Sequence, residues 1–229
     1  MIFPRNNNFR SFHVFLTLQV ICIIIGLIFF GACSSIDIKS YKSPDMANYK
    51  IRKVAIMPLV ITSSAQTRVS GNYSPNWIVE TFTTTALSPA EYFPAEQEMV
   101  SSLSNKLGKI EIITPSTIDS AMKGKKLQTY DSAILEIAKH FKADAVISFR
   151  IRDVILRAGS QIEGRSAAQG HVDLTLYSSE GSPLWSISSE AVYRKGSAFS
   201  HAPSMASFMK YIMEEYNTEI EDLATQIHP

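Results

Sequence analysis

The segment "SAAQGHVDLTLYSSEGSPLWSISSEAVYRK", residues 166–195, contains the clearest strand pattern in the chain. Its first half alternates strictly between polar residues and small or apolar ones, which predicts a half-buried strand. The small or apolar set on this strand is Ala168, Gly170, Val172, Leu174 and Leu176. "EGS", residues 180–182, supplies a tight turn into a return strand, on which Trp185 shares the parity of Ile187 and Ala191. The segment therefore predicts an antiparallel hairpin with one polar face and one buried face that includes Trp185.

The rest of the chain predicts further strands and helices around this hairpin. "ADAVISFRIRDVIL", residues 143–156, alternates in the same way, while "KVAIMPLV", residues 53–60, and "IEIIT", residues 110–114, are apolar runs typical of buried strands. Apolar residues at helical spacing predict helices over residues 94–107, 116–122, 131–141 and 203–226. The order β-α-β-α-α-β-β-β-α predicts one α/β domain over residues 51–229. Its mixed sheet should have about five strands, with a C-terminal antiparallel meander and packed helices.

Residues 61–93 interrupt this scaffold with a long connection rich in Ser, Thr, Pro and aromatic residues. Neither the strand period nor the helix period persists in it, and connections of this length are often functional. Two interpretations stay open: the aromatic rings pack the loop onto the domain, or the loop binds a partner or faces the membrane. Exposed aromatic side chains dominate interface energetics. The partner-binding candidates are therefore Tyr73, Trp77, Phe82, Tyr92 and Phe93.

"GLIFFGACSS", residues 26–35, ends an apolar run that follows two arginines. A positive segment, an apolar segment and terminal small residues predict a secretory signal over residues 1–32. The stretch "FGAC" resembles the bacterial lipobox, in which an apolar residue and two small ones precede a cysteine. The resemblance implies cleavage between Ala32 and Cys33 and attachment of a diacylglycerol to the Cys33 thiol. An uncleaved membrane anchor and ordinary soluble secretion are the alternatives.

The lipobox also implies a location for the processed protein. The residue after the cysteine is Ser34, and in Gram-negative lipoproteins a serine there resembles an outer-membrane address. Acyl chains on Cys33 would then hold the chain on the outer membrane, facing the periplasm. Residues 34–50 are polar with no sustained period, so residues 33–50 are expected to form a lipidated tether.

Composition excludes several classes of function. The chain has 229 residues, of which 45% are hydrophobic and 19% are charged, so it is expected to be globular. Its net charge is +1, from 22 basic and 21 acidic residues, so a nucleic-acid partner is not expected. The two cysteines, Cys22 and Cys33, both precede the predicted domain and leave it without thiols.

The chain lacks the sequence motifs of the common metal sites, phosphate sites and nucleophilic active sites. Asp173 and Glu190 lie on neighbouring predicted strands, but a glycosidase pair needs a cleft, and a flat sheet offers none. We therefore expect no catalytic residue, no metal and no cofactor.

Three stretches together carry a more specific resemblance: "KVAIMPL", "ADAVISFRIRDV" and "VDLTLYSSEGSPLWSISSEAVYR". Over about residues 50–195 the sequence resembles the bacterial lipoprotein group that includes CsgG, LpoB and the DUF799-type proteins. Their fold is similar to that of the N-terminal domain of TolB. The resemblance implies a non-enzymatic accessory or assembly factor that contacts other envelope proteins. A subunit of an oligomeric secretion channel of the CsgG type, and so a homo-oligomer, is the first alternative. An envelope enzyme with an unrecognised site is the second.

Overall fold

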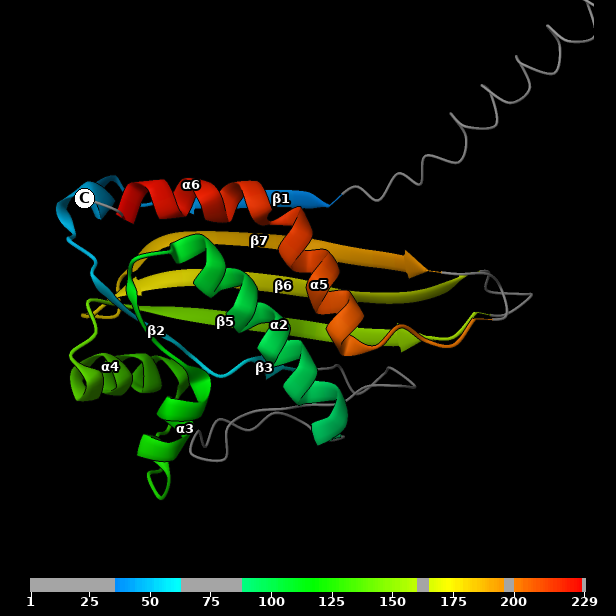
Figure 1. Cartoon of the computed structure of the whole chain (residues 1–229), viewed down its shortest axis with the longest axis horizontal. Helices are drawn as coiled ribbons and strands as arrows, with labels where there is room; N and C mark the ends of the chain where they lie inside the picture. The colour runs from blue at the N-terminus through cyan, green and yellow to red at the C-terminus, as the bar shows by residue number, and fades with distance from the viewer. Residues whose placement is uncertain (1–35, 63–87, 160–164, 196–199, 228–229) are drawn as a thin grey trace, which may run out of the picture. The chain divides into compact units, whose positions relative to one another are not determined.

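The structure is a computed structural model that describes residues 36–62, 88–159, 165–195 and 200–227. The chain divides into two units, Met1–Ser35 and Ile36–Pro229, and every described residue belongs to the second. The predicted α/β class is confirmed, because one mixed sheet is covered by helices (Figure 1). The strands are β1 (Asp37–Lys42), β2 (Lys53–Ile56), β3 (Val60–Ile61), β4 (Glu111–Ile113), β5 (Ala145–Arg157), β6 (Ser166–Ser178) and β7 (Pro183–Lys195). The helices are η1 (Pro44–Asn48), α2 (Pro89–Leu107), α3 (Pro115–Met122), α4 (Tyr130–Phe141), α5 (Met205–Glu215) and α6 (Asn217–Ile227).

The sheet has seven strands in the order β1-β7-β6-β5-β2-β4, and β3 pairs with the middle of β5. The long strands β5, β6 and β7 form the antiparallel meander that the hairpin pattern predicts, and β1 extends it antiparallel to β7. The short strands are different, since β2 runs parallel to both β4 and β5. The apolar strand β2 therefore lies between two strands and is buried, as its composition predicts.

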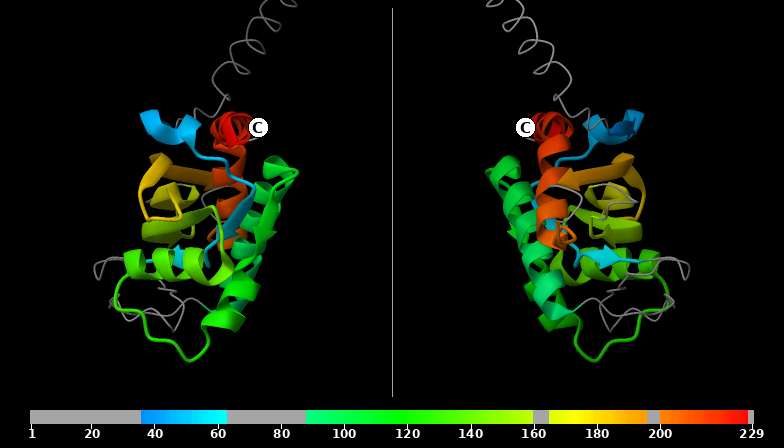
Figure 2. Two further views of the ribbon diagram at one scale, coloured as in Figure 1. Left: turned by 90° about the vertical axis from the view of Figure 1, so that its left-hand side faces the viewer. Right: turned by 90° about the vertical axis from the view of Figure 1, so that its right-hand side faces the viewer.

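Helices pack against both faces of the sheet (Figure 2). Helices α2, α5 and α6 share the larger core with residues on one face of β5, β6 and β7. Helices α3 and α4 share a smaller core with the opposite face near β2, where Ala55 and Val146 meet Ile118 and Ile134. Trp185 is 3% exposed and belongs to the larger core with Ile187 and Ala191, so its predicted burial is confirmed.

A β-bulge in β5 changes which residues of that strand face the helices. The register against β6 shifts between Arg152 and Ile155, and Asp153 takes a left-handed φ of 54°. Before the bulge the odd-numbered residues are buried, whereas after it Leu156 is buried and Arg157 is exposed. Gly170 lies beside this irregularity, where an added Cβ would come within 2.9 Å of the Ile151 Cγ2 atom. The close approach explains why a glycine occupies this strand position.

The segment predicted to be a tether contains ordered structure. Residues Asp37–Lys42 form β1 along the edge of β7, and Met46 in η1 is 2% exposed. The Ser43 N–H also donates to the Leu184 carbonyl at 2.8 Å. The sequence does not indicate this strand, because β1 exposes nearly every side chain and so has no alternating pattern. Its position instead depends on backbone pairing with a strand about 150 residues later in the chain.

Two helix boundaries also differ from the prediction. Helix α2 begins at Pro89 rather than Pro94, with Pro89 in the first turn where a missing N–H costs little. The single helix predicted over residues 203–226 is instead two helices, α5 and α6, which meet at Tyr216 (Figure 1). Tyr216 is fully buried, and its hydroxyl oxygen lies 2.6 Å from that of Ser189 on β7. This buried contact ties the helix break to the sheet.

Candidate interaction surface

The described residues show neither a membrane-spanning helix nor a metal-binding cluster. Within residues 36–62, 88–159, 165–195 and 200–227, no helix is long and apolar enough to cross a bilayer. The same residues bring no group of three or more His, Cys, Asp and Glu side chains into metal-binding proximity. The features of this part of the chain that could bind a partner are its cavities and its exposed apolar side chains.

Most of the residues singled out from the sequence lie outside the described part of the chain: Ala32, Cys33, Tyr73, Trp77 and Phe82. The other two, Tyr92 and Phe93, lie in the first turns of α2 and not in a loop. Their rings make an edge-to-face contact with centroids 5.4 Å apart. Tyr92 is 1% exposed, whereas Phe93 is 54% exposed. Direct contact between Tyr92 and a partner therefore does not fit this structure, but Phe93 remains a candidate.

Tyr92 and Glu96 connect α2 to the segment between β2 and β3. The Glu96 Oε2 atom accepts the Leu59 N–H at 2.9 Å and a hydrogen bond from the Tyr92 hydroxyl. The same hydroxyl lies 3.0 Å from the Leu59 carbonyl oxygen. One turn of helix therefore lies against both backbone polar groups of Leu59: Glu96 satisfies the buried N–H, and the carbonyl shares the single Tyr92 hydroxyl proton with Glu96.

Burial raises the pKa of Glu96, because a carboxylate loses hydration when it is taken out of water. The hydrogen bonds from Tyr92 and the Leu59 N–H oppose this shift, and the nearby Asp119 adds to it. The sequence pattern does not single out Glu96, because it predicts a helix that starts only at Pro94. The signal was nevertheless present, since Tyr92 and Glu96 are four residues apart and so share one helix face.

Beside this contact lies a cavity of about 410 Å³ between α2 and the start of α3, which we name the Phe93 cavity. It is lined by Phe93, Glu96, Gln97, Val100, Ser101, Thr114, Pro115 and Ser116. Apolar groups from Phe93, Val100 and Pro115 share the lining with the partly buried Glu96 carboxylate. An apolar side chain with a neighbouring hydrogen-bond donor would fit this mixture.

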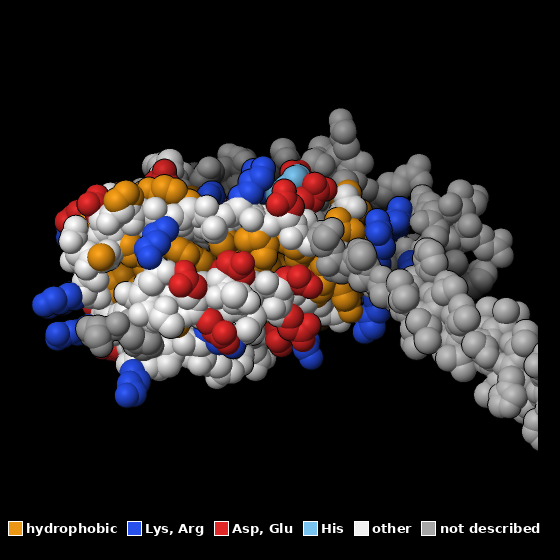
Figure 3. Space-filling view, turned by 90° about the horizontal axis from the view of Figure 1, so that it is seen from above, with side chains coloured by type: hydrophobic (Ala, Val, Ile, Leu, Met, Phe, Trp, Pro, Cys, Tyr) orange, Lys and Arg blue, Asp and Glu red, His pale blue; other side chains and the backbone are white. Residues whose placement is uncertain are grey.

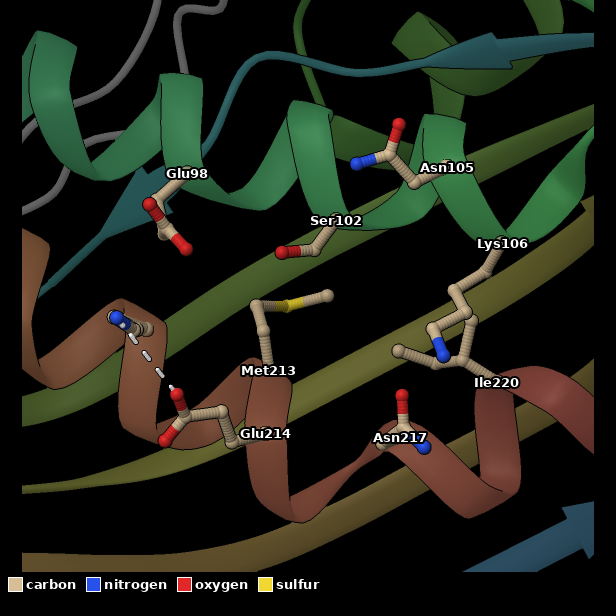
Figure 4. A pocket seen from close by; sticks show the side chains of 9 residues that line it. Glu98, Ser102, Asn105, Lys106, Met213, Glu214, Asn217 and Ile220 are labelled. Carbon is tan, nitrogen blue, oxygen red and sulfur yellow. Dashed lines mark ion pairs between the residues drawn. The ribbon is translucent and has the colours of Figure 1, made fainter.

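A second, smaller hollow of about 190 Å³ follows the contact between α2 and the α5–α6 pair (Figure 4). Both of its lysines are already paired: Lys210 lies 3.9 Å from Glu214, and Lys106 pairs with Glu221. Met213 and Ile220, both almost fully buried, belong to the core beneath it. These features are typical of a solvated seam between packed helices.

The polar face of the meander carries a hydrogen-bonded network. Arg152 Nε donates to Asp173 Oδ2 at 2.8 Å, and the Ser188 hydroxyl donates to Asp173 Oδ1 at 2.8 Å. Asp173 lies opposite Ser188 in the register, whereas Glu190 lies opposite His171. Both Asp173 oxygens are thus engaged across three strands, which indicates a structural role for this carboxylate.

No family model matches the chain, and no curated protein matches its sequence. The chain is similar to several solved structures. The PelC dodecamer from Paraburkholderia phytofirmans is 13% identical, with a TM-score of 0.41, and the match covers 84% of this chain and 97% of that one. Lipoprotein GNA1162 from Neisseria meningitidis is 15% identical, with a TM-score of 0.45, and the match covers 74% of this chain and 98% of that one. The LpoB C-terminal domain from Escherichia coli is 14% identical, with a TM-score of 0.37, and the match covers 62% of this chain and 84% of that one.

Proposed function

We propose that this chain is an outer-membrane lipoprotein whose periplasmic α/β domain acts as a non-enzymatic accessory or assembly factor for other envelope proteins. The "FGAC" stretch ending at Cys33 supports the lipid anchor, and Ser34 supports the outer-membrane address. Protein contacts through the Phe93 cavity supply the activity. The observation that carries this role is the 54% exposure of Phe93 on the rim of that cavity.

An exposed aromatic ring next to a cavity is typical of an interaction surface. Burying a phenylalanine against a partner removes a large apolar area from water, and aromatic residues contribute much of the binding energy at interfaces. The Phe93 ring is restrained by its edge-to-face contact with Tyr92, which hydrogen bonds to Leu59 and Glu96 hold in the core. A fixed ring loses little conformational entropy when a partner binds.

The test is Phe93→Ala, with Leu135→Ala as the matched control. Leu135 is also a large exposed apolar residue, 46% accessible, but it lies on α4 away from the cavity. Co-purification of envelope proteins should fall roughly tenfold or more in Phe93→Ala, as for a hot-spot residue worth about 2 kcal/mol. It should be unchanged in Leu135→Ala. Melting temperatures of both variants should stay close to that of the native protein. The same partners at native yield with Phe93→Ala would contradict the proposal.

A second candidate function, the subunit of an oligomeric secretion channel, is favoured by the two edges of the sheet. Among the described strands, β1 pairs only with β7 and β4 pairs only with β2. Pairing of unlike edges on successive copies is a head-to-tail contact, which closes into a ring when the rotation allows. Native mass spectrometry of the detergent-extracted protein decides between the candidates, because a monomer rules out the channel subunit.

A further inference from the structure

One end of the sheet carries a cluster of four basic residues, which we name the basic strand end: Arg157, Arg165, Arg194 and Lys195. They lie at the end of β5, just before β6 and at the end of β7, and all four are exposed. Arg157 and Arg194 both lie opposite Ala167 in the register, so their backbones are two strand spacings apart, about 10 Å. Lys and Arg side chains are visible at the right-hand end of the domain in Figure 3.

The bulge in β5 places the arginines of this cluster on one face of the sheet. Arg157 follows the register shift at Asp153, so its side chain lies on the same face of the sheet as those of Ala167 and Arg194. Without the shift, Arg157 would lie on the face of Ile151 and point toward the helices. Arg165 precedes Ala167 by two residues and so lies on the same face as Ala167.

The positive charges of the basic strand end are not neutralised within the described part of the chain. None of the four side chains forms an ion pair there, whereas the neighbouring Arg152 is paired with Asp173. The last three residues of β5 and β7 and the first three of β6 include no Asp or Glu. The cluster therefore presents four like charges, which favour an anionic partner.

The position of the lipid-bearing residue identifies that partner. Because β1 runs antiparallel to β7, the chain enters β1 from the end of the sheet at which β7 terminates. Cys33 precedes Ile36 by three residues, so the two Cα atoms are at most about 11 Å apart whatever the conformation between them. Arg194 lies four residues along β7 from Glu190, the partner of Asp37, or about 13 Å. An acylated Cys33 would therefore hold the basic strand end close to the membrane surface.

We propose that the basic strand end binds anionic phospholipid headgroups of the leaflet that holds Cys33, and so sets the orientation of the domain on the membrane. This inference rests on the lipid anchor of the proposed function. Each basic residue close to an anionic surface changes the ratio of docked to undocked protein roughly fivefold. With four such residues, the docked orientation predominates over an anionic bilayer.

The experiment uses the full mature protein, extracted with its acyl chains and reconstituted in vesicles. A dye at Ala158→Cys, beside Arg157, reports energy transfer to headgroup-labelled lipid, and a dye at Glu180→Cys reports on the opposite strand ends. Transfer from position 158 should be stronger on vesicles containing phosphatidylglycerol than on phosphatidylcholine alone, and stronger than transfer from position 180. High salt should abolish the difference between the vesicles, because it screens exposed charges.

The decisive variant neutralises the cluster with Arg157→Gln, Arg165→Gln, Arg194→Gln and Lys195→Gln. Its matched control makes the same change in net charge elsewhere, with Lys50→Gln, Lys109→Gln, Lys123→Gln and Lys139→Gln, all exposed positions. The first variant should lose the dependence on anionic lipid, and the second should keep it.

Two outcomes overturn the inference. The first is equal transfer on both kinds of vesicle. The second is unchanged transfer in the cluster variant, including the case in which that variant instead loses a co-purified protein. Mass spectrometry of the N-terminal peptide distinguishes failure of this inference from failure of the proposed lipid anchor. An unmodified Cys33 removes the lipid anchor together with this inference, whereas an acylated Cys33 without lipid-dependent transfer removes this inference alone.

Discussion

At the scale of single residues, Glu96 shows how one side chain can serve both stability and a binding surface. Its carboxylate accepts hydrogen bonds from the Leu59 N–H and the Tyr92 hydroxyl, and Glu96 also lines the Phe93 cavity. The hydrogen bonds favour the ionised form, while burial disfavours it by a larger amount, so the pKa of Glu96 is raised. The folded state therefore binds the Glu96 proton more tightly than the unfolded chain does.

This difference predicts a pH dependence of folding. A proton held more tightly in the folded state favours folding at low pH, and that contribution is lost as the pH rises from the usual glutamate range through the raised pKa. The free energy of unfolding should therefore fall across that window. In Glu96→Gln this part of the fall should disappear, while the amide oxygen can still accept the Leu59 N–H.

Chemical denaturation at a series of pH values measures this effect. Glu98→Gln is the control, because it removes the same charge from the same helix at a residue that does not bond Leu59. Parallel curves for the native protein and Glu96→Gln would show that Glu96 has no such role.

At the scale of elements, β1 gives the N-terminal segment a regular structure that its sequence pattern does not indicate. A tether of residues 33–50 would let the domain move far from the membrane, but Asp37–Lys42 pairs with β7 and η1 packs Met46 into the core. The chain between Cys33 and the sheet is consequently only a few residues long. The domain is thus restricted to the neighbourhood of the bilayer wherever Cys33 is acylated.

Hydrogen exchange tests whether β1 is an integral strand. Backbone amides of residues 37–42 that point toward β7 should exchange slowly, and those on the outer edge should exchange quickly, because antiparallel strands alternate between the two sides. About half of the amides in this segment should therefore be protected, as resolved by mass spectrometry on short peptides. Uniformly fast exchange across the segment would show that residues 37–42 form an unpaired tether and not a strand.

At the scale of the whole molecule, the lipid anchor and the folded domain have separate determinants. Anchoring is predicted from the short motif at Cys33, whereas binding is proposed at the Phe93 cavity and at the basic strand end. The domain contains no cysteine, so its stability depends on its two hydrophobic cores and not on disulfides. Changes at the anchor should therefore leave the fold intact.

Replacing Cys33 tests the anchor directly. Cys33→Ser removes the thiol that would receive the diacylglycerol, so labelling with a fatty-acid probe should be lost and a larger unprocessed species should accumulate. Cys22→Ser is the matched control, because it removes the other cysteine from within the apolar run and should leave labelling unchanged. Persistent label on Cys33→Ser would disprove the lipobox assignment.

The sequence by itself determined the α/β class, the order of the main elements and the buried face of the meander. These features depend on local periods of two and 3.6 residues, which is why Trp185 could be placed in the core from its parity alone. Only the tertiary structure decided the pairing of β1, the burial of Tyr92 beside the exposed Phe93, the helix break at Tyr216 and the exposure of Arg157. Each of these depends on a partner that is distant in the sequence or on a bulge that shifts parity. Local patterns carry no information about such contacts.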